Sequence, residues 1–217
     1  MDQYRTLIIV PALNEAENLS NTIGELLSIA RVLVVDDGSF DNTALLAYDN
    51  GADVIQHIKN MGYGEALETG FIYAIQRGFQ FVVTCDADGQ HPPTVVRQVV
   101  DLLECGADVV IAERTSMARF GEYCFSVYAR LRYGVHDPLS GLKGYLISAL
   151  RGVDRLDMES SIGTGLLFSM LKRGKKVSTF KFNVLPRTYG SPRFGSGLKA
   201  NYKLLIAIFR DLSKKYK

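Results

Sequence analysis

Short apolar runs rich in β-branched residues alternate with amphipathic segments along the first half of the chain. A short apolar run bounded by turn residues predicts a strand, and the predicted strands are Thr6–Val10, Arg31–Val35, Ala52–His57, Phe79–Cys85 and Asp108–Ala112. The segments between them predict helices, namely a run through Leu19, Ile23, Leu26 and Leu27, followed by Thr43–Asp49, Glu65–Arg77 and Thr94–Glu104. This alternation predicts an α/β fold with a mainly parallel central sheet flanked by helices.

The middle of the chain is less regular. Ser116–Val135 interleaves aromatic residues with arginines. That pattern is typical either of a groove for a membrane surface or lipid phosphate, or of an amphipathic helix whose arginines lie along its polar margin. Asp137–Tyr145 predicts a polar turn, Gly163–Arg173 predicts a helix, and Lys175–Val184 predicts a strand.

The C-terminal part is basic. Pro186–Gly197 is a glycine-rich loop that carries Arg187 and Arg193, and Leu198–Lys217 places apolar residues on one broad face and lysines on the rest. A helix of this kind can lie on an anionic lipid surface. It can equally pack on the domain, with lysines favoured at its end by the helix dipole.

The stretch Val82–Pro93 carries the strongest candidate chemistry. Its apolar residues stop at Asp86 and Asp88, and Gln90 follows. Ligands bind outside the carboxyl ends of parallel strands, and carboxylate and amide oxygens suit Mg²⁺ or Mn²⁺. The pattern therefore predicts a divalent-cation site that substrate phosphates would complete. The alternative is that the two aspartates only cap a turn or the next helix.

Composition narrows the class of protein. Hydrophobic residues make up 47% of the 217 residues, which is enough for a sizeable core, and the formal net charge of +2 gives no reason to expect a nucleic-acid partner. The three cysteines are scattered, which predicts reduced thiols and a cytoplasmic protein. We expect no signal peptide and no membrane span, so any membrane contact would be peripheral.

Five short motifs stand in order along the chain. They are Pro11-Ala12-Leu13-Asn14-Glu15, Val34-Val35-Asp36-Asp37-Gly38-Ser39, Asn60-x-Gly62-x-Gly64, Cys85-Asp86-Ala87-Asp88-Gly89-Gln90-His91-Pro92 and Asp137-x-x-Ser140-Gly141-x-Lys143. Together they resemble family 2 glycosyltransferases of the GT-A fold. Within that family the chain is most similar to the dolichol-phosphate mannose synthase branch, whose members move sugars onto polyprenyl phosphates.

The resemblance implies a role for each matching residue. Asp88 and Gln90 would be the first choices as direct ligands of Mg²⁺ or Mn²⁺, with Asp86 beside them. Asp88, Arg114 and Asp137 would be the catalytic residues. The residues implied to hold the nucleotide-sugar are Pro11, Leu13, Glu15, Val35, Asp37, Asp86, Ala87, Arg114, Arg187 and Arg193.

The acceptor decides whether a base is needed. A phosphate acceptor is already an anion, whereas a hydroxyl must lose its proton to a carboxylate. Asp137 would be that base, although its position is as easily structural, and the turn Ser140–Lys143 would lie near the sugar and the acceptor. Two departures from the family pattern bear on the acceptor. Ala112-Glu113-Arg114 replaces Gly-Ser-Arg, and Pro192-Arg193 replaces Ser-Lys.

The sequence thus predicts one GT-A domain over residues 1–217, with a nucleotide-sugar half (1–115), an acceptor-side half (116–197) and a basic helix (198–217). The predicted activity is metal-dependent, inverting transfer of a sugar from a UDP- or GDP-sugar to a polyprenyl phosphate. We expect a cytoplasmic protein, peripheral at the inner face of the membrane. The alternatives are transfer to a hydroxyl of a glycan or small acceptor in cell-surface polysaccharide synthesis, and a non-catalytic nucleotide-sugar-binding subunit.

Overall fold

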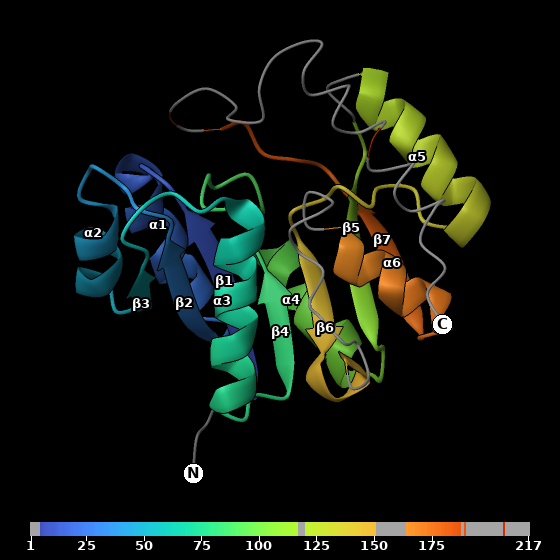
Figure 1. Ribbon diagram of the computed structural model, residues 1–217, viewed down its shortest axis with the longest axis horizontal. Helices are drawn as coiled ribbons and strands as arrows, with labels where there is room; N and C mark the ends of the chain where they lie inside the picture. Colours follow the sequence, from blue (N-terminus) through green and yellow to red (C-terminus); the bar gives the residue numbers. More distant parts are fainter. Residues whose placement is uncertain (1–4, 117–119, 151–163, 188, 190–205, 207–217) are drawn as a thin grey trace.

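The computed structural model describes residues 5–116, 120–150, 164–187, 189 and 206, and these form a sheet flanked by helices on both faces (Figure 1). The sheet has the strand order β3-β2-β1-β4-β6-β5-β7. Its strands are β1 (Thr6–Ala12), β2 (Arg31–Asp36), β3 (Asp53–Gln56), β4 (Phe81–Thr84), β5 (Val109–Arg114), β6 (Lys143–Leu146) and β7 (Val177–Phe182). Its helices are α1 (Ala16–Leu27), α2 (Thr43–Asp49), α3 (Tyr63–Gln76), α4 (Pro93–Glu104), α5 (Phe120–Tyr133), α6 (Gly165–Lys172) and a 3₁₀ turn (Ile147–Leu150).

Alternating side chains of the strands face two separate cores. Leu7 and Ile9 of β1 belong to a core shared with α3, α5 and α6. Ile8 and Val10 belong to a core shared with α1, α2 and α4. Because successive residues of a strand point to opposite faces, the continuous apolar run of β1 is what a strand covered on both sides requires. Figure 1 views the sheet from the face that α3 and α6 cover.

The strands predicted in the first half are all present, with ends that differ by one or two residues. Their pairing is parallel from β3 through β4 and again between β5 and β7. Ser116–Val135 contains the helix α5, in which Phe125 and Ala129 are buried. The helix predicted at Leu198–Lys217 and most of the loop Pro186–Gly197 lie outside the described residues.

The prediction of a polar turn over Asp137–Tyr145 was wrong for its last three residues. Lys143–Leu146 is the strand β6, which runs antiparallel between β4 and β5. A lysine and a glycine at the start of a four-residue strand gave no strand signal. The glycine has a packing reason, since a Cβ on Gly144 would lie 2.7 Å from side-chain atoms of Leu103 and Val99 in α4.

A helix that crosses a bilayer needs about 20 consecutive, predominantly apolar residues. In the part of the chain that the structure describes, no helix combines the length and the apolar character that crossing a membrane requires.

Candidate functional site

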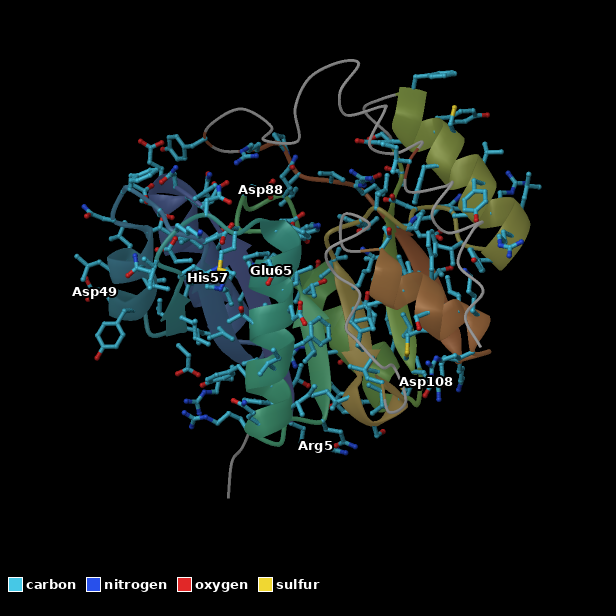
Figure 2. All side chains as sticks on the ribbon, viewed as in Figure 1. Arg5, Asp49, His57, Glu65, Asp88 and Asp108 are labelled. Atoms are coloured by element: carbon cyan, nitrogen blue, oxygen red, sulfur yellow. The ribbon has the colours of Figure 1, made fainter. Side chains whose placement is uncertain are left out.

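Most of the predicted site residues that the structure describes lie near the ends of β1, β2, β4 and β5. Asp86 and Asp88 lie in the loop that follows β4, and Arg114 is the last residue of β5. Figure 2 shows Asp88 at this edge of the sheet, with Arg5 and Asp108, which precede β1 and β5, at the opposite edge. The parallel strands therefore bring chemically active side chains together from distant parts of the sequence, as ligand sites in open α/β sheets require.

Asp86 lies between the start of α3 and the turn before β6. The Tyr63 hydroxyl donates a hydrogen bond of 3.2 Å to Asp86 Oδ1. On the other side the backbone of Gly141 is so close that a Cβ at this position would overlap the Asp86 carboxylate. The glycine of the Ser140-Gly141 motif therefore makes room for Asp86.

Replacing Gly141 by alanine should move Asp86 without unfolding the protein. The overlapping atoms belong to a flexible side chain, so the carboxylate can swing away at little cost. We expect Gly141→Ala to lower sugar transfer roughly ten- to hundredfold, as small displacements of catalytic groups do, with little change in melting temperature. Gly144→Ala is the matched control, because its Cβ meets the α4 core instead and should lower stability. Equal activity in Gly141→Ala and the wild type would contradict this account.

Asp88 is a partly buried carboxylate next to a second one. Its Oδ1 accepts a hydrogen bond of 3.1 Å from the backbone N–H of Gln90. Burial raises the pKa of Asp88, and the charge of Asp86 raises it further. Two neighbouring carboxylates resist ionising together unless a cation lies between or beside them.

The donor atoms around Asp88 fit a hard divalent cation. Two carboxylates and the amide oxygen of Gln90 are all oxygen ligands, which suit Mg²⁺ or Mn²⁺. Across the described ranges, no three acidic, histidine or cysteine side chains are grouped so as to hold a metal by themselves. Mg²⁺ is commonly held by one or two carboxylates together with substrate phosphates, and this donor set fits that arrangement.

The segment that follows β7 crosses over the Asp88 loop. Leu185 N–H donates to the Gln90 carbonyl at 3.0 Å, and Gln90 Nε2 donates to the Leu185 carbonyl at 3.2 Å. Two residues further on, Arg187 Nη2 donates to Glu15 Oε1 at 2.7 Å, and Arg187 Nη1 lies 3.6 Å from Asp88 Oδ2. Arg187 thus connects a predicted metal ligand with a predicted nucleotide-binding residue.

A cavity of about 660 Å³ opens beside this ion pair. It lies between the N-terminal ends of α1 and α2, and its walls include Glu15, Asn18, Phe40, Arg187 and Tyr189. Its volume is in the range of small-molecule sites. Two of the predicted nucleotide-sugar residues therefore border a cavity of suitable size.

The other predicted nucleotide residues lie nearby on β1, β2 and the Asp88 loop. Pro11 of β1 and Val35 of β2 are register partners, and both are buried. Leu13 is half-buried just after β1, and Ala87 is buried between the two aspartates. Arg193 lies outside the described residues.

Asp37 has partners within the protein. Its Oδ1 accepts the Met61 N–H at 2.8 Å and lies 2.8 Å from His57 Nδ1, and its Oδ2 accepts the Gly62 N–H at 2.7 Å. These bonds fix the loop that leads into α3, where Gly62 has a φ of 105° that favours glycine. Contact of Asp37 with a base or ribose stays a prediction.

Arg114 and Asp137 form an ion pair in which the guanidinium reaches both carboxylate oxygens. Arg114 Nε donates to Asp137 Oδ2 at 2.7 Å and Nη2 donates to Oδ1 at 2.9 Å, and the Arg114 backbone N–H adds a third bond of 3.1 Å to Oδ2. Asp137 is buried. Both oxygens of the residue predicted as a base therefore already accept hydrogen bonds from Arg114.

Lys143 brings a second buried cation to the same region. As the first residue of β6 it is paired with Thr84 at the end of β4 and with Ile111 of β5. Burial lowers the pKa of Lys143 to about 8, against the opposing effect of the Asp137 and Asp86 charges. The ammonium therefore loses its proton at a much lower pH than an ordinary lysine.

Three residues enter this region that the sequence did not single out. His57 bonds to Asp37, Tyr63 donates to Asp86, and Asn18 Nδ2 donates to Glu15 Oε2 at 2.6 Å. Tyr63 stands inside the Asn60-x-Gly62-x-Gly64 motif, which could have drawn attention to it. His57 and Asn18 follow no pattern, and only their positions in the fold reveal them.

Comparison with known proteins places this geometry in context. Residues 7–124, more than half of the chain, match the model of the family described as glycosyl transferase family 2. Polyprenol monophosphomannose synthase of Mycolicibacterium smegmatis is 27% identical over 95% of this chain and 85% of that protein. Undecaprenyl-phosphate mannosyltransferase of Micrococcus luteus is 29% identical over 89% of each chain.

Solved structures share the fold. Glucosyl-3-phosphoglycerate synthase from Mycobacterium tuberculosis, in complex with phosphoglyceric acid, superimposes with a TM-score of 0.75 at 21% identity, covering 96% of this chain and 80% of that one. The complex of that synthase with Mn²⁺, UDP and glucosyl-3-phosphoglycerate gives a TM-score of 0.68 at 22% identity, over 87% of this chain and 74% of that one. The predicted GT-A architecture is thereby confirmed.

Proposed function

We propose, since this chain belongs to glycosyl transferase family 2 and is therefore a glycosyltransferase, that it moves a sugar from a UDP- or GDP-sugar to a polyprenyl phosphate. The transfer would use Mg²⁺ or Mn²⁺, invert the anomeric centre, and take place at the cytoplasmic face of the membrane. Two relatives that align with most of this chain carry names that specify polyprenyl or undecaprenyl phosphate acceptors, which supports this choice.

The observation that carries the proposal is the engagement of the Asp137 carboxylate by Arg114. A hydroxyl acceptor needs a carboxylate to take its proton, and Asp137 is the residue predicted for that task. Both of its oxygens accept hydrogen bonds from Arg114. A phosphate acceptor arrives as an anion and needs no such base, so the geometry favours it over a hydroxyl.

On the donor side, Asp86, Asp88 and the Gln90 amide oxygen would hold the divalent cation. When bound, such a cation stabilises the negative charge that develops on the departing nucleoside diphosphate. Arg187, which lies beside Asp88, would add a guanidinium suited to phosphate oxygens. Glu15 and the adjoining cavity would receive the nucleoside part of the donor.

On the acceptor side, Lys143 is the cation that would meet the acceptor phosphate. It is buried between the ends of β4 and β5, near Asp86 and Asp137. The Asp137 carboxylate neutralises the charge of Arg114, so Arg114 attracts an acceptor phosphate less strongly. A buried ammonium beside the reacting atoms attracts an anion strongly, because little water screens it.

Activity should therefore fall above about pH 8, the lowered pKa of Lys143. Below that pH the ammonium is charged and attracts the acceptor phosphate. Above it the neutral amine does not, so kcat/KM for the acceptor should decline about tenfold per pH unit. Lys143→Arg should move this decline beyond about pH 10, because a guanidinium stays charged. An identical decline in both proteins would show that another group is titrating.

The exposed face of α5 would provide membrane contact. Phe120, Tyr123, Val127 and Leu131 are exposed large side chains spaced three or four residues apart, so they lie along one side of the helix. Arg130 and Arg132 are also exposed near its end, where they would pair with anionic lipid phosphates. Figure 1 shows α5 at the outer edge of the molecule, beyond β5 and β7.

The proposal is tested by a transfer assay with matched lipids. Labelled UDP- and GDP-hexoses would be offered to the protein with Mn²⁺ and phospholipid vesicles that contain either undecaprenyl phosphate or undecaprenol. We expect label in the lipid fraction only when the phosphate is present. Label on undecaprenol, or on a soluble glycan in preference to undecaprenyl phosphate, would overturn the proposal and favour a hydroxyl acceptor.

A further inference from the structure

Arg187 stands between two carboxylates that belong to different parts of the proposed site. Its Nη2 is 2.7 Å from Glu15 Oε1, which is a hydrogen bond, while its Nη1 is 3.6 Å from Asp88 Oδ2, which is an ion pair without a hydrogen bond. The side chains of Arg187 and Asp88 are only 15% and 14% exposed, so water screens the pair less than at a surface. One guanidinium thus neutralises two acids, unequally.

The backbone holds Arg187 in this place. Leu185 is tied to the Gln90 backbone and side chain. Tyr189 N–H donates to Asn18 Oδ1 at 3.2 Å, and Asn18 Nδ2 donates to the Tyr189 carbonyl at 3.3 Å. The crossing segment, meaning Leu185–Arg187 and Tyr189, is therefore attached to the Asp88 loop at one end and to α1 at the other. These contacts on both sides of Arg187 hold its guanidinium beside Asp88.

This arrangement conflicts with a divalent cation on Asp88. A guanidinium and a metal ion compete for the same carboxylate and repel one another at short range. Glu15 offers Arg187 a second partner, at the shorter distance. Arg187 can therefore give up Asp88 and keep Glu15. Its Nε donates to the Tyr189 carbonyl at 2.8 Å, so Nη1, which faces Asp88 in the free protein, is the nitrogen that would turn to an incoming diphosphate.

We propose that Arg187 is an internal counter-ion that occupies Asp88 in the metal-free protein, and that Glu15 is the positioning residue that retains Arg187 when Asp88 takes a divalent cation. This inference rests on the proposed function, which places the cation at Asp88. It implies that the free protein binds the cation weakly. A nucleotide diphosphate draws Arg187 away from Asp88 and so strengthens cation binding, which makes the two ligands cooperative.

Mn²⁺ binding without nucleotide is the direct measurement, made on the full chain by the electron paramagnetic resonance signal of free Mn²⁺. Arg187→Gln removes the competitor and should bind Mn²⁺ about three- to tenfold more tightly than the wild type, the scale of one partly buried ion pair. Arg97→Gln is the charge-matched control, because Arg97 is exposed on α4, and it should change nothing. Adding UDP or GDP should strengthen Mn²⁺ binding in the wild type much more than in Arg187→Gln.

A double-mutant cycle separates this mechanism from simple electrostatics. Glu15→Gln should weaken Mn²⁺ binding in the wild-type background, because Arg187 then pairs more fully with Asp88. In the Arg187→Gln background the same change should have no effect. Additive effects would mean that the two charges act on the metal separately, and would overturn the proposal. If Glu15→Gln does not fold by circular dichroism, the comparison of Arg187→Gln with Arg97→Gln decides alone.

Failure of the inference and failure of the proposed function give different results. If the wild type binds Mn²⁺ through Asp88, as shown by loss of binding in Asp88→Asn, but Arg187→Gln binds no more tightly, only the counter-ion role is overturned. If no variant binds Mn²⁺ with or without nucleotide, the proposed metal-dependent function fails, and the counter-ion role fails with it.

Discussion

Replacing Asp88 by asparagine is expected to lower the rate of sugar transfer by about a thousandfold, the scale on which loss of a charge-stabilising group slows a reaction. The substitution keeps the shape of the side chain and an oxygen that can accept the Gln90 N–H. It removes the charge that would hold the divalent cation and that Arg187 approaches. The measurement is kcat/KM with saturating Mn²⁺, with Asp49→Asn, an exposed acid at the end of α2, as the surface control.

The same variant should be at least as stable as the wild type. The pKa of Asp88 is raised by burial and by Asp86 above its ordinary value of 3.8. Between about pH 4 and that raised pKa the folded state holds more protons than the unfolded state, so the wild type loses stability as pH rises. Asparagine does not titrate, so the advantage of Asp88→Asn in free energy of unfolding should grow through this window. An active variant, or one less stable than the wild type at neutral pH, would contradict the role assigned to Asp88.

The fold was predictable where local pattern and tertiary context agree. The apolar runs at β1, β2 and β4 are covered on both faces, so their hydrophobicity is continuous and unmistakable. The sequence did not predict β6, because its residues are determined by contacts with β4, β5 and α4, which are far away in the sequence. Lys143 belongs to the site and Gly144 to the packing of α4, and neither constraint leaves a strand pattern.

The sequence named candidate site residues, but it did not indicate which of them contact one another. The predicted strands placed Asp86, Asp88 and Arg114 at or near strand ends, and the structure brings those ends to one edge of the sheet. Which carboxylate pairs with which arginine depends on distances between loops. The spacing of motifs along the sequence does not determine those distances. Arg114 was predicted to hold the nucleotide-sugar, and the structure adds that its guanidinium is bonded to Asp137.

Removing the Asp137 side chain is expected to be the most destabilising change at the site. In Asp137→Ala the Arg114 guanidinium, which is 23% exposed, keeps its charge but loses both hydrogen bonds to carboxylate oxygens. Glu122, with Oε2 3.7 Å from Arg114 Nη2, is too distant to replace them. Breaking a buried ion pair from one side costs about 3–5 kcal/mol, which for a domain of this size lowers the melting temperature by roughly 6–20 °C.

Asp137→Asn separates a structural clamp from a catalytic base. Asparagine keeps one acceptor oxygen for Arg114 but loses the second acceptor and the negative charge, so it should lose about 1.5–3 kcal/mol, the scale of a charged hydrogen bond and less than the loss in Asp137→Ala. If Asp137 positions Arg114, Asp137→Asn should keep much of the transfer activity, and its rate should depend on pH as in the wild type. A base would behave in the opposite way, with activity abolished, the acidic limb of the pH–rate profile lost and stability nearly intact. That outcome would also remove the argument for a phosphate acceptor, because the argument depends on Asp137 being engaged by Arg114.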